Sequence, residues 1–191
     1  MASKSVKILL TGVPGCGKTT AIIRIAANLK EIKTAGFYTQ EIRQGNVRKG
    51  FCWKSLPGSA GTPWPDGDGA DGILAHIDIK GPFRVGKYGV DVAGFEESVV
   101  SALDIERTGA ELFIIDEIGK MECMSEKFVA AVRRLFASDK SVLAAVALKG
   151  AALISEVKNY PGTKLFNLTR RGSDKTIAEI LQIFSFLKRS S

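Results

Sequence analysis

A glycine-rich segment near the amino terminus constrains the fold of this chain more than any other feature. Residues 12–19 read GVPGCGKT, which fits the pattern G-x-x-x-x-G-K-[ST] of phosphate-binding loops. The apolar run at 6–10 predicts a buried strand, and apolar residues spaced three and four apart predict a helix that begins at Lys18. A strand, a glycine-rich loop and a helix in this order predict an α/β fold built around the loop.

The residue types in this loop suit a nucleoside triphosphate. Glycines let backbone N–H groups curve around phosphate oxygens, and the amino end of the next helix adds positive potential. Lys18 would reach the β- and γ-phosphates, and the Thr19 hydroxyl would bind Mg²⁺. The alternative is a glycine-rich turn with an accidental lysine. The predicted nucleotide-binding residues of this segment are Gly12, Val13, Pro14, Gly15, Cys16, Gly17, Lys18, Thr19 and Thr20.

A second candidate segment begins at Leu112. Four apolar residues followed by Asp116 are typical of a central parallel strand, whose carboxyl end would hold the acid beside the glycine-rich loop as a second Mg²⁺ ligand. Glu117 follows, and alternation along a strand predicts that it points away from Asp116 unless the strand end twists. The predicted nucleotide-binding residues of this segment are Leu112, Phe113, Ile114, Ile115, Asp116, Glu117, Ile118 and Gly119.

We assign the chemistry to two side chains. Glu117 would orient and deprotonate a water molecule that approaches the γ-phosphate, a role worth roughly 10²–10⁴-fold in rate. Its alternative is an exposed acid in a loop. Lys18 would stabilise the phosphate charge during the reaction. Lys18 and Glu117 are therefore the candidate catalytic residues, and Thr19 and Asp116 the candidate metal ligands.

The charge of the chain favours a small anionic ligand. The formal net charge is +7, from 27 Lys and Arg against 20 Asp and Glu. The cations are scattered along the sequence, and basic residues do not alternate with aromatic ones as they do in many single-strand binders. We therefore do not expect nucleic acid as a partner, and the sequence indicates no particular protein partner.

The same composition predicts a cytoplasmic protein without a membrane partner. No apolar stretch approaches the roughly 20 residues of a membrane span, and residues 1–6 lack the apolar region of a secretory signal. Three widely spaced cysteines do not make a disulfide framework.

The order of the predicted elements indicates one P-loop domain over 1–191, with a mainly parallel, RecA-like sheet flanked by helices. An antiparallel or irregular insertion would occupy about 42–92. Within it, 57–73 is rich in Gly, Pro and Asp and predicts a long loop, which is either a functional lid or a disordered segment. Further strands are expected at 36–41, 48–56, 76–80, 87–92, 141–148 and 164–168, and further helices at 94–106, from Ser125, and from 173 or 174.

Three further runs resemble the THEP1 family of nucleoside-triphosphatases: GFYTQEIR at 36–43, VGKYGVD at 85–91 and DEIGKME at 116–122. The resemblance runs in order from about Val6 to Thr169. It implies a RecA-like core, Mg²⁺ as cofactor, slow turnover, and hydrolysis of ATP, GTP and other nucleoside triphosphates to diphosphates with broad base tolerance. After Thr169 the chain lacks the Asn-Arg pair that the family often carries at this place.

A cation near the γ-phosphate would stabilise charge in the transition state. Each candidate has the alternative of a solvated surface charge. The candidates are Arg43, Arg84, Lys120, Arg170 and Arg171.

Two other functions fit the same core. A nucleotide or small-molecule kinase would use the insertion as a lid over its acceptor, although the adjacent acids at 116 and 117 favour water as acceptor. A regulatory switch would cycle between nucleotide states, although the guanine-reading run Asn-Lys-x-Asp is absent. Hydrolysis of nucleoside triphosphates by water is our leading hypothesis.

Overall fold

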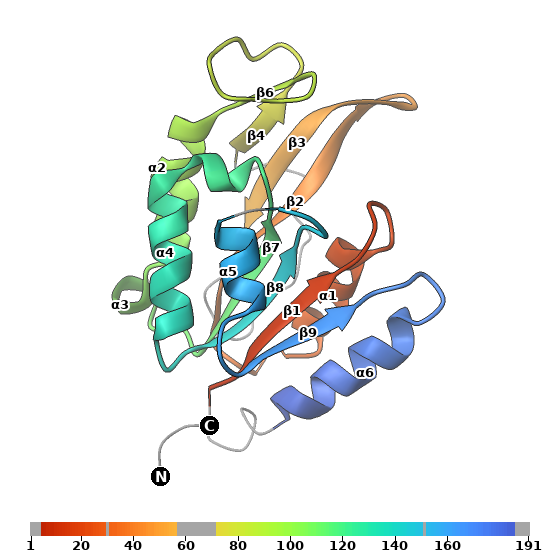
Figure 1. The fold of residues 1–191 in the computed structure, drawn as a ribbon, viewed down its shortest axis with the longest axis vertical. Helices are drawn as coiled ribbons and strands as arrows, with labels where there is room; N and C mark the ends of the chain where they lie inside the picture. The colour runs from red at the N-terminus through yellow and green to blue at the C-terminus, as the bar shows by residue number, and fades with distance from the viewer. Residues whose placement is uncertain (1–4, 30, 57–71, 151, 186–191) are drawn as a thin grey trace.

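A nine-stranded mixed sheet runs through the protein (Figure 1). The computed structural model describes residues 5–29, 31–56, 72–150 and 152–185. The strands lie in the order β5-β6-β4-β3-β2-β7-β8-β1-β9. Their bounds are β1 Lys7–Thr11, β2 Thr34–Gln44, β3 Val47–Ser55, β4 Gly72–His76, β5 Arg84–Val85, β6 Tyr88–Val90, β7 Leu112–Ile118, β8 Ser141–Val146 and β9 Thr163–Asn167.

Strand pairing in the sheet changes from parallel to antiparallel at β2. The first residues of this strand, Thr34 to Phe37, pair in parallel with β7, and the parallel pairing continues through β8 and β1 to β9. From Phe37 to Gln44 the same strand pairs antiparallel with β3, and the remaining strands are also antiparallel. The predicted parallel core and antiparallel insertion are therefore halves of one sheet rather than a sheet with a separate appendage.

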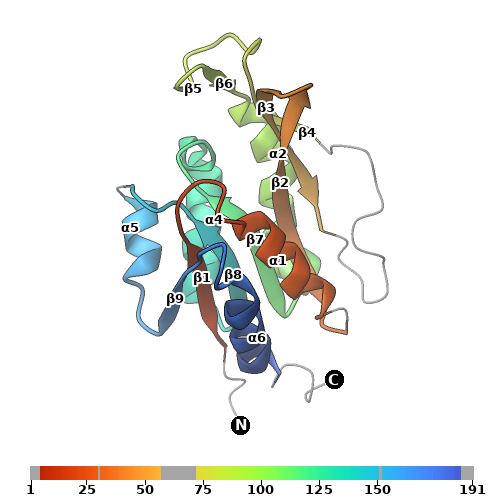
Figure 2. The ribbon, with the colours of Figure 1, turned by 90° about the vertical axis from the view of Figure 1, so that its right-hand side faces the viewer.

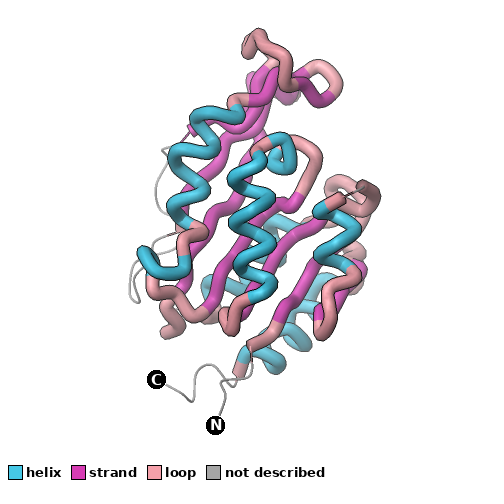
Figure 3. The backbone as a smooth tube through the Cα atoms, turned by 60° about the vertical axis from the view of Figure 1, so that its left-hand side comes forward, coloured by secondary structure: helices cyan, strands magenta, loops and turns pink. Residues whose placement is uncertain are grey.

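Helices cover both faces of the parallel half. On one face lie α1 Lys18–Ala27 and α6 Ser173–Phe184, and on the other lie α2 Val92–Ala102, α4 Glu126–Ala137 and α5 Leu153–Lys158 (Figures 2 and 3). The described residues also form two short helical turns, α3 Ile105–Thr108 and η1 Glu122–Met124. None of the described helices is long and apolar enough to cross a membrane.

Each face of the sheet buries its own core, because side chains alternate along the central strands. Ile114 of β7 packs with the buried residues of α1 and α6. Its neighbours Phe113 and Ile115 belong to the other core, with the apolar faces of α2, α4 and α5. At roughly 25 cal/mol per Å² of apolar surface, these two cores supply the main stabilisation that holds the strand ends in place.

Local signals in the sequence explain most element boundaries. The Ser125 hydroxyl accepts a hydrogen bond from the Phe128 N–H at 2.9 Å and so caps α4, as predicted. The predicted helix at 94–106 is wrong in detail, because α2 ends at Ala102 with Leu103 as its carboxyl cap, and Asp104 caps a separate turn, α3. The strand predicted at 76–80 is also misplaced: β4 ends at His76.

Two other outcomes concern the insertion and the end of the sheet. The loop predicted at 57–73 lies almost wholly outside the described residues, apart from Gly72 and Ile73, which begin β4. Helix α5, at 153–158, was not predicted. Its six residues are too few for a periodic pattern to stand out.

Candidate active site

The glycine-rich loop connects β1 to α1 at the carboxyl edge of the parallel strands. Gly12, Gly15 and Gly17 all have positive φ, at 157°, 73° and 100°. A Cβ on Gly12 would lie 2.6 Å from the Leu168 carbonyl oxygen and 2.7 Å from the Cys16 Sγ, so this position requires glycine. The loop closes on itself through a hydrogen bond of 3.1 Å from the Cys16 N–H to the Val13 carbonyl.

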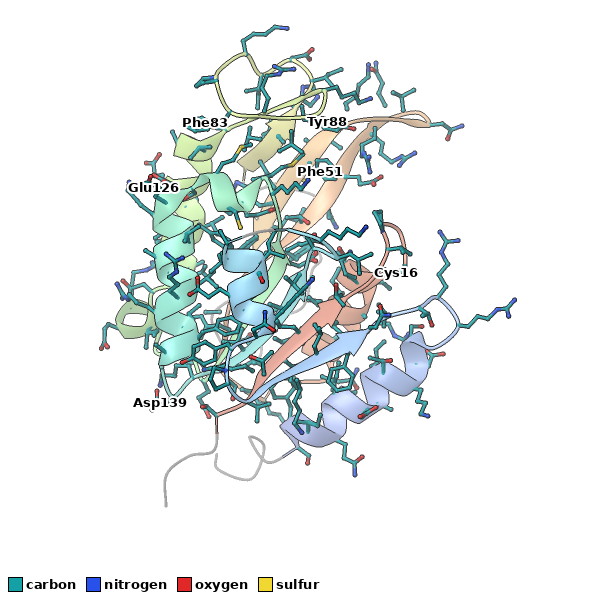
Figure 4. The ribbon with its side chains drawn as sticks, in the orientation of Figure 1. Cys16, Phe51, Phe83, Tyr88, Glu126 and Asp139 are labelled. Atoms are coloured by element: carbon teal, nitrogen blue, oxygen red, sulfur yellow. The ribbon has the colours of Figure 1, made fainter. Side chains whose placement is uncertain are left out.

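The segment after β9 forms a wall beside this loop. The Leu168 N–H donates to the Thr11 carbonyl at 2.7 Å, and the Arg170 Nε donates to the Gly15 carbonyl at 3.1 Å. A pocket of about 300 Å³ lies between the two segments, and Figure 4 marks Cys16 on the side of the loop. Its lining residues are Val13, Pro14, Cys16, Asn167, Leu168, Thr169 and Arg170.

Asp116 lies near the carboxyl end of β7 and is almost completely buried. Neither carboxylate oxygen accepts a well-formed hydrogen bond from the described residues. Burial raises the pKa of this carboxyl to about 6, while the nearby Thr19 hydroxyl favours its charged form. A buried carboxylate with unsatisfied oxygens beside a hydroxyl fits a hard cation such as Mg²⁺.

The number of protein ligands at this place is small. Among the described residues, no group of three or more His, Cys, Asp or Glu side chains could hold a metal ion. Thr19 and Asp116 remain the two predicted ligands, and a Mg²⁺ held by few protein groups takes its other ligands from phosphate oxygens and water.

Glu117 faces the glycine-rich loop. Its Oε2 lies 3.3 Å from the Lys18 Nζ, with 28% of the Glu117 side chain and 11% of the Lys18 side chain exposed. The sequence predicts that Glu117 and Asp116 point apart unless the end of the strand twists; in the structure the charges of Glu117 and Lys18 both act on the Asp116 pKa. The pairing of β7 with β8 shifts between Ile115 and Ile118, which interrupts the regular alternation at these two acids.

Glu122 is a site residue that our sequence reasoning did not single out. This carboxyl group of η1 is buried, and its pKa is raised to about 8, mainly by burial and also by the charges of Glu117 and Asp116. A Cβ on Gly119 would lie 2.7 Å from the Glu122 Oε2 and 3.3 Å from the Glu117 Oε1, so the two carboxyl groups approach the same backbone. The run DEIGKME contained the only sequence signal for this third acid.

Five of the predicted nucleotide-binding residues are buried in the core instead. The side chains of the β7 core are fully buried, so they position Asp116 but are not accessible to a ligand. These residues are Leu112, Phe113, Ile114, Ile115 and Ile118.

The candidate cations differ in which part of the protein they contact. Arg43 bonds to Glu41, and Arg84 bonds to the carbonyls of Ile79 and Lys87, all within the antiparallel half. Of the five candidates, only Arg170 makes a hydrogen bond to the glycine-rich loop among the contacts of the described residues.

Comparison with known proteins places this site in a family context. The model of a family described as "NTPase" matches residues 7–181. The chain is 38% identical over 180 residues to nucleoside-triphosphatase THEP1 of Thermotoga maritima, covering 94% of this chain and 96% of that protein. It is 32% identical over 189 residues to the human cancer-related nucleoside-triphosphatase, covering 91% of this chain and 94% of the relative.

Solved structures agree with these matches. The crystal structure of THEP1 from Aquifex aeolicus has a TM-score of 0.79 at 30% identity and covers 94% of this chain and 99% of its own. The solution structure of the human nucleoside triphosphatase has a TM-score of 0.74 at 31% identity, with coverage of 95% and 98%.

Proposed function

Because the chain belongs to the THEP1 family of nucleoside-triphosphatases, we propose that it hydrolyses nucleoside triphosphates to diphosphates with Mg²⁺ and with little preference for the base. It is an enzyme, a hydrolase that acts on phosphoric anhydrides. Beyond this enzyme class, we propose which metal the enzyme uses, which residues form its site and which nucleotides it accepts.

One observation carries the proposal: Lys18, Asp116 and Glu117 meet at the carboxyl edge of the parallel strands, next to a glycine-rich loop at the amino end of α1. Ligands of open α/β sheets bind at this edge. Backbone N–H groups of Gly15, Gly17 and Lys18 and the Lys18 ammonium would bind the phosphates. Thr19 and Asp116 would hold Mg²⁺, which would neutralise charge on the β- and γ-phosphate oxygens.

Glu117 would act as the base toward water. In the structure its carboxylate is paired with the Lys18 ammonium at 3.3 Å. A triphosphate offers Lys18 a more highly charged partner, so its binding would draw the ammonium away and free the carboxylate to accept a proton from water. The base would thus become available only when the phosphates are in place.

The pocket beside the loop supports broad base tolerance. It is lined by apolar side chains, Asn167, Thr169 and Arg170, and none of its described lining residues is a carboxylate. A guanidinium plane can stack on any base, because every base presents a π face. The Asn-Lys-x-Asp run that would select guanine is absent from the sequence.

A panel of nucleotides tests the substrate range and the metal together. Phosphate release from the common NTPs and dNTPs would be followed with Mg²⁺ and with EDTA, with and without added acceptor hydroxyl compounds. We expect Mg²⁺-dependent release from every nucleotide without an acceptor. Nucleoside diphosphate formation that requires an acceptor would identify a kinase instead, and activity on a single base would refute the proposed tolerance.

The variant Glu117→Gln tests the base. It should retain Mg-NTP binding, and bind more tightly than wild type because Lys18 loses its competing partner, while hydrolysis falls by roughly 10²–10⁴-fold. Glu97→Gln, on the exposed surface of α2, is the matched control and should leave both unchanged. Turnover of Glu117→Gln at the wild-type rate would remove Glu117 from this role.

A further inference from the structure

The antiparallel half of the sheet ends in a surface that gathers much of the positive charge of the chain. We call residues 41–49 and 78–88 the basic tip. It carries six cations against two carboxylates, a net charge of +4, compared with +7 for the whole chain. The cations are Arg43, Arg48, Lys49, Lys80, Arg84 and Lys87, and the acids are Glu41 and Asp78.

The two segments of the basic tip are fixed to each other. The N–H of Ile77, the residue directly before the second segment, donates to the Lys49 carbonyl at 3.0 Å and holds the two backbones together. Arg48 donates to the Tyr88 hydroxyl at 3.0 Å and to the Glu41 carboxylate at 2.7 Å. Its guanidinium also lies 5.0 Å from the centre of the Phe51 ring, a cation–π contact. The charges therefore sit on a preformed surface rather than on independent loops.

Most of this charge is not neutralised locally. Arg43 and Arg48 share the single carboxylate of Glu41, and 49% and 43% of their side chains remain exposed. Arg84 donates to the backbone carbonyls of Ile79 and Lys87. Within the described ranges, no carboxylate forms an ion pair with Lys49, Lys80, Arg84 or Lys87.

An exposed aromatic ring belongs to the second segment of the basic tip. Phe83 is 45% exposed and precedes Arg84 (Figure 4). Exposed cations that follow a phosphate chain, combined with a ring on which a base can stack, are the two components of a single-strand binding surface. A duplex would leave the ring unused, since its bases are already stacked.

The basic tip also faces the active end of the sheet. Phe37 of β2 pairs with Ile115, so residues 41–44 extend past Ile118, where β7 ends. In Figures 1 and 2 the β2–β3 hairpin and the β5–β6 segment stand beyond the strands that carry the glycine-rich loop. A single-stranded nucleic acid bound at the basic tip would therefore lie on the side of the protein that carries the candidate nucleotide site.

From the fixed geometry, the unpaired cations and the exposed ring, we propose that the basic tip binds single-stranded nucleic acid. The sequence had led us to expect no such partner, because its cations are scattered along the chain. The antiparallel strands bring them together. This inference is independent of the proposed hydrolysis, since it concerns a different surface and has its own binding readout.

Binding of fluorescently labelled 20-nucleotide oligo(U) and oligo(dT) to the full-length protein, followed by anisotropy from 50 to 200 mM salt, tests the proposal. With four to six phosphate contacts, the slope of log K against log salt should be about −3 to −4. Binding of either strand supports the proposal, and tighter binding of oligo(U) would identify RNA as the favoured form.

Matched variants locate the surface. The triple change Lys80→Glu, Arg84→Glu and Lys87→Glu should abolish binding, and Phe83→Ala should weaken it by about tenfold or more. The control triple, which changes Lys33, Arg134 and Lys164 to Glu, makes the same change in net charge on other exposed surfaces and should lose much less.

Three outcomes would overturn the proposal. These are equal losses in the two triple variants, a preference for duplex DNA over single strands, and binding to phosphatidylserine-containing vesicles without binding to either oligonucleotide. Melting temperatures of all variants, measured alongside, identify any loss that comes from unfolding. Phe83→Ala then serves as the variant that leaves every charge in place.

Discussion

The buried carboxyl of Glu122 makes the stability of the protein depend on pH in a predictable direction. Burial and the neighbouring acids raise its pKa from an ordinary value of 4.5 to about 8. Between these two pH values the folded protein holds a proton that the unfolded chain releases. The stabilisation linked to this proton should therefore have its full value below pH 4.5. The free energy of unfolding should then decrease as pH rises toward 8.

The magnitude follows from the same two values. A tenfold change in proton affinity corresponds to about 1.4 kcal/mol, so the full change in pKa amounts to roughly 5 kcal/mol at most. That is a large share of the roughly 5–15 kcal/mol that stabilises a typical domain. Glu122→Gln replaces the protonated carboxyl with a neutral group of similar shape that has no proton to lose. The variant should match wild type near pH 4.5 and exceed it by several kcal/mol at pH 8–9.

Urea unfolding at pH 5, 7 and 9, with EDTA and without nucleotide, measures this difference. Glu97→Gln removes an exposed acid from α2 and serves as the control, with no expected change in pH dependence. If wild type and Glu122→Gln lose stability in parallel from pH 5 to 9, Glu122 is not the group that holds the proton. A variant that is less stable than wild type at pH 9 would contradict the reasoning as well.

Three further changes test the loop and its support. Lys18→Ala should weaken nucleotide affinity roughly 10- to 100-fold, since hydrogen bonds to charged groups contribute about 1.5–3 kcal/mol; unchanged affinity by calorimetry in EDTA would exclude Lys18 as a phosphate ligand. Gly12→Ala should distort the loop, because its Cβ would lie 2.6 Å from the Leu168 carbonyl oxygen, and the variant should lose nucleotide binding and about 1–3 kcal/mol of stability. Lys7→Met should lower the free energy of unfolding by about 2–4 kcal/mol, because the Lys7 Nζ donates to three carbonyls at and just after the end of α4. Urea unfolding measures this loss, and wild-type stability would show that these carbonyls find other partners.

Much of the parallel half of the fold could be predicted from the sequence. Continuous apolar runs such as 112–115 identify central strands, and a cap such as Ser125 identifies the start of a helix. The antiparallel half was harder, because its short strands take their boundaries from pairing across the sheet. His76 ends β4 where its pairing with Gly50 ends, and this pairing depends on residues far apart in sequence.

Short motifs predicted a candidate site, and the structure brings the residues of these motifs to one edge of the sheet. The loop and Asp116 follow from the pattern alone. The orientation of Glu117 was not predictable, since a regular strand would direct it away from Asp116, and a local shift in strand register interrupts the alternation. Glu122 was missed for another reason: its effect arises from burial beside other acids, and burial of a single acid leaves no periodic signal in the sequence.

The place of β1 in the sheet has a consequence for how the protein is made. This strand carries the glycine-rich loop near the amino terminus, yet it lies between β8 and β9, two strands from the last third of the chain. During synthesis the loop therefore leaves the ribosome early. Leu168 and Arg170, which form hydrogen bonds beside and to this loop, leave the ribosome late. A nascent chain that ends before β9 would contain the complete motif but an open site. Nucleotide capture should therefore begin only when synthesis is nearly finished, which makes it a sensitive report of full-length folding.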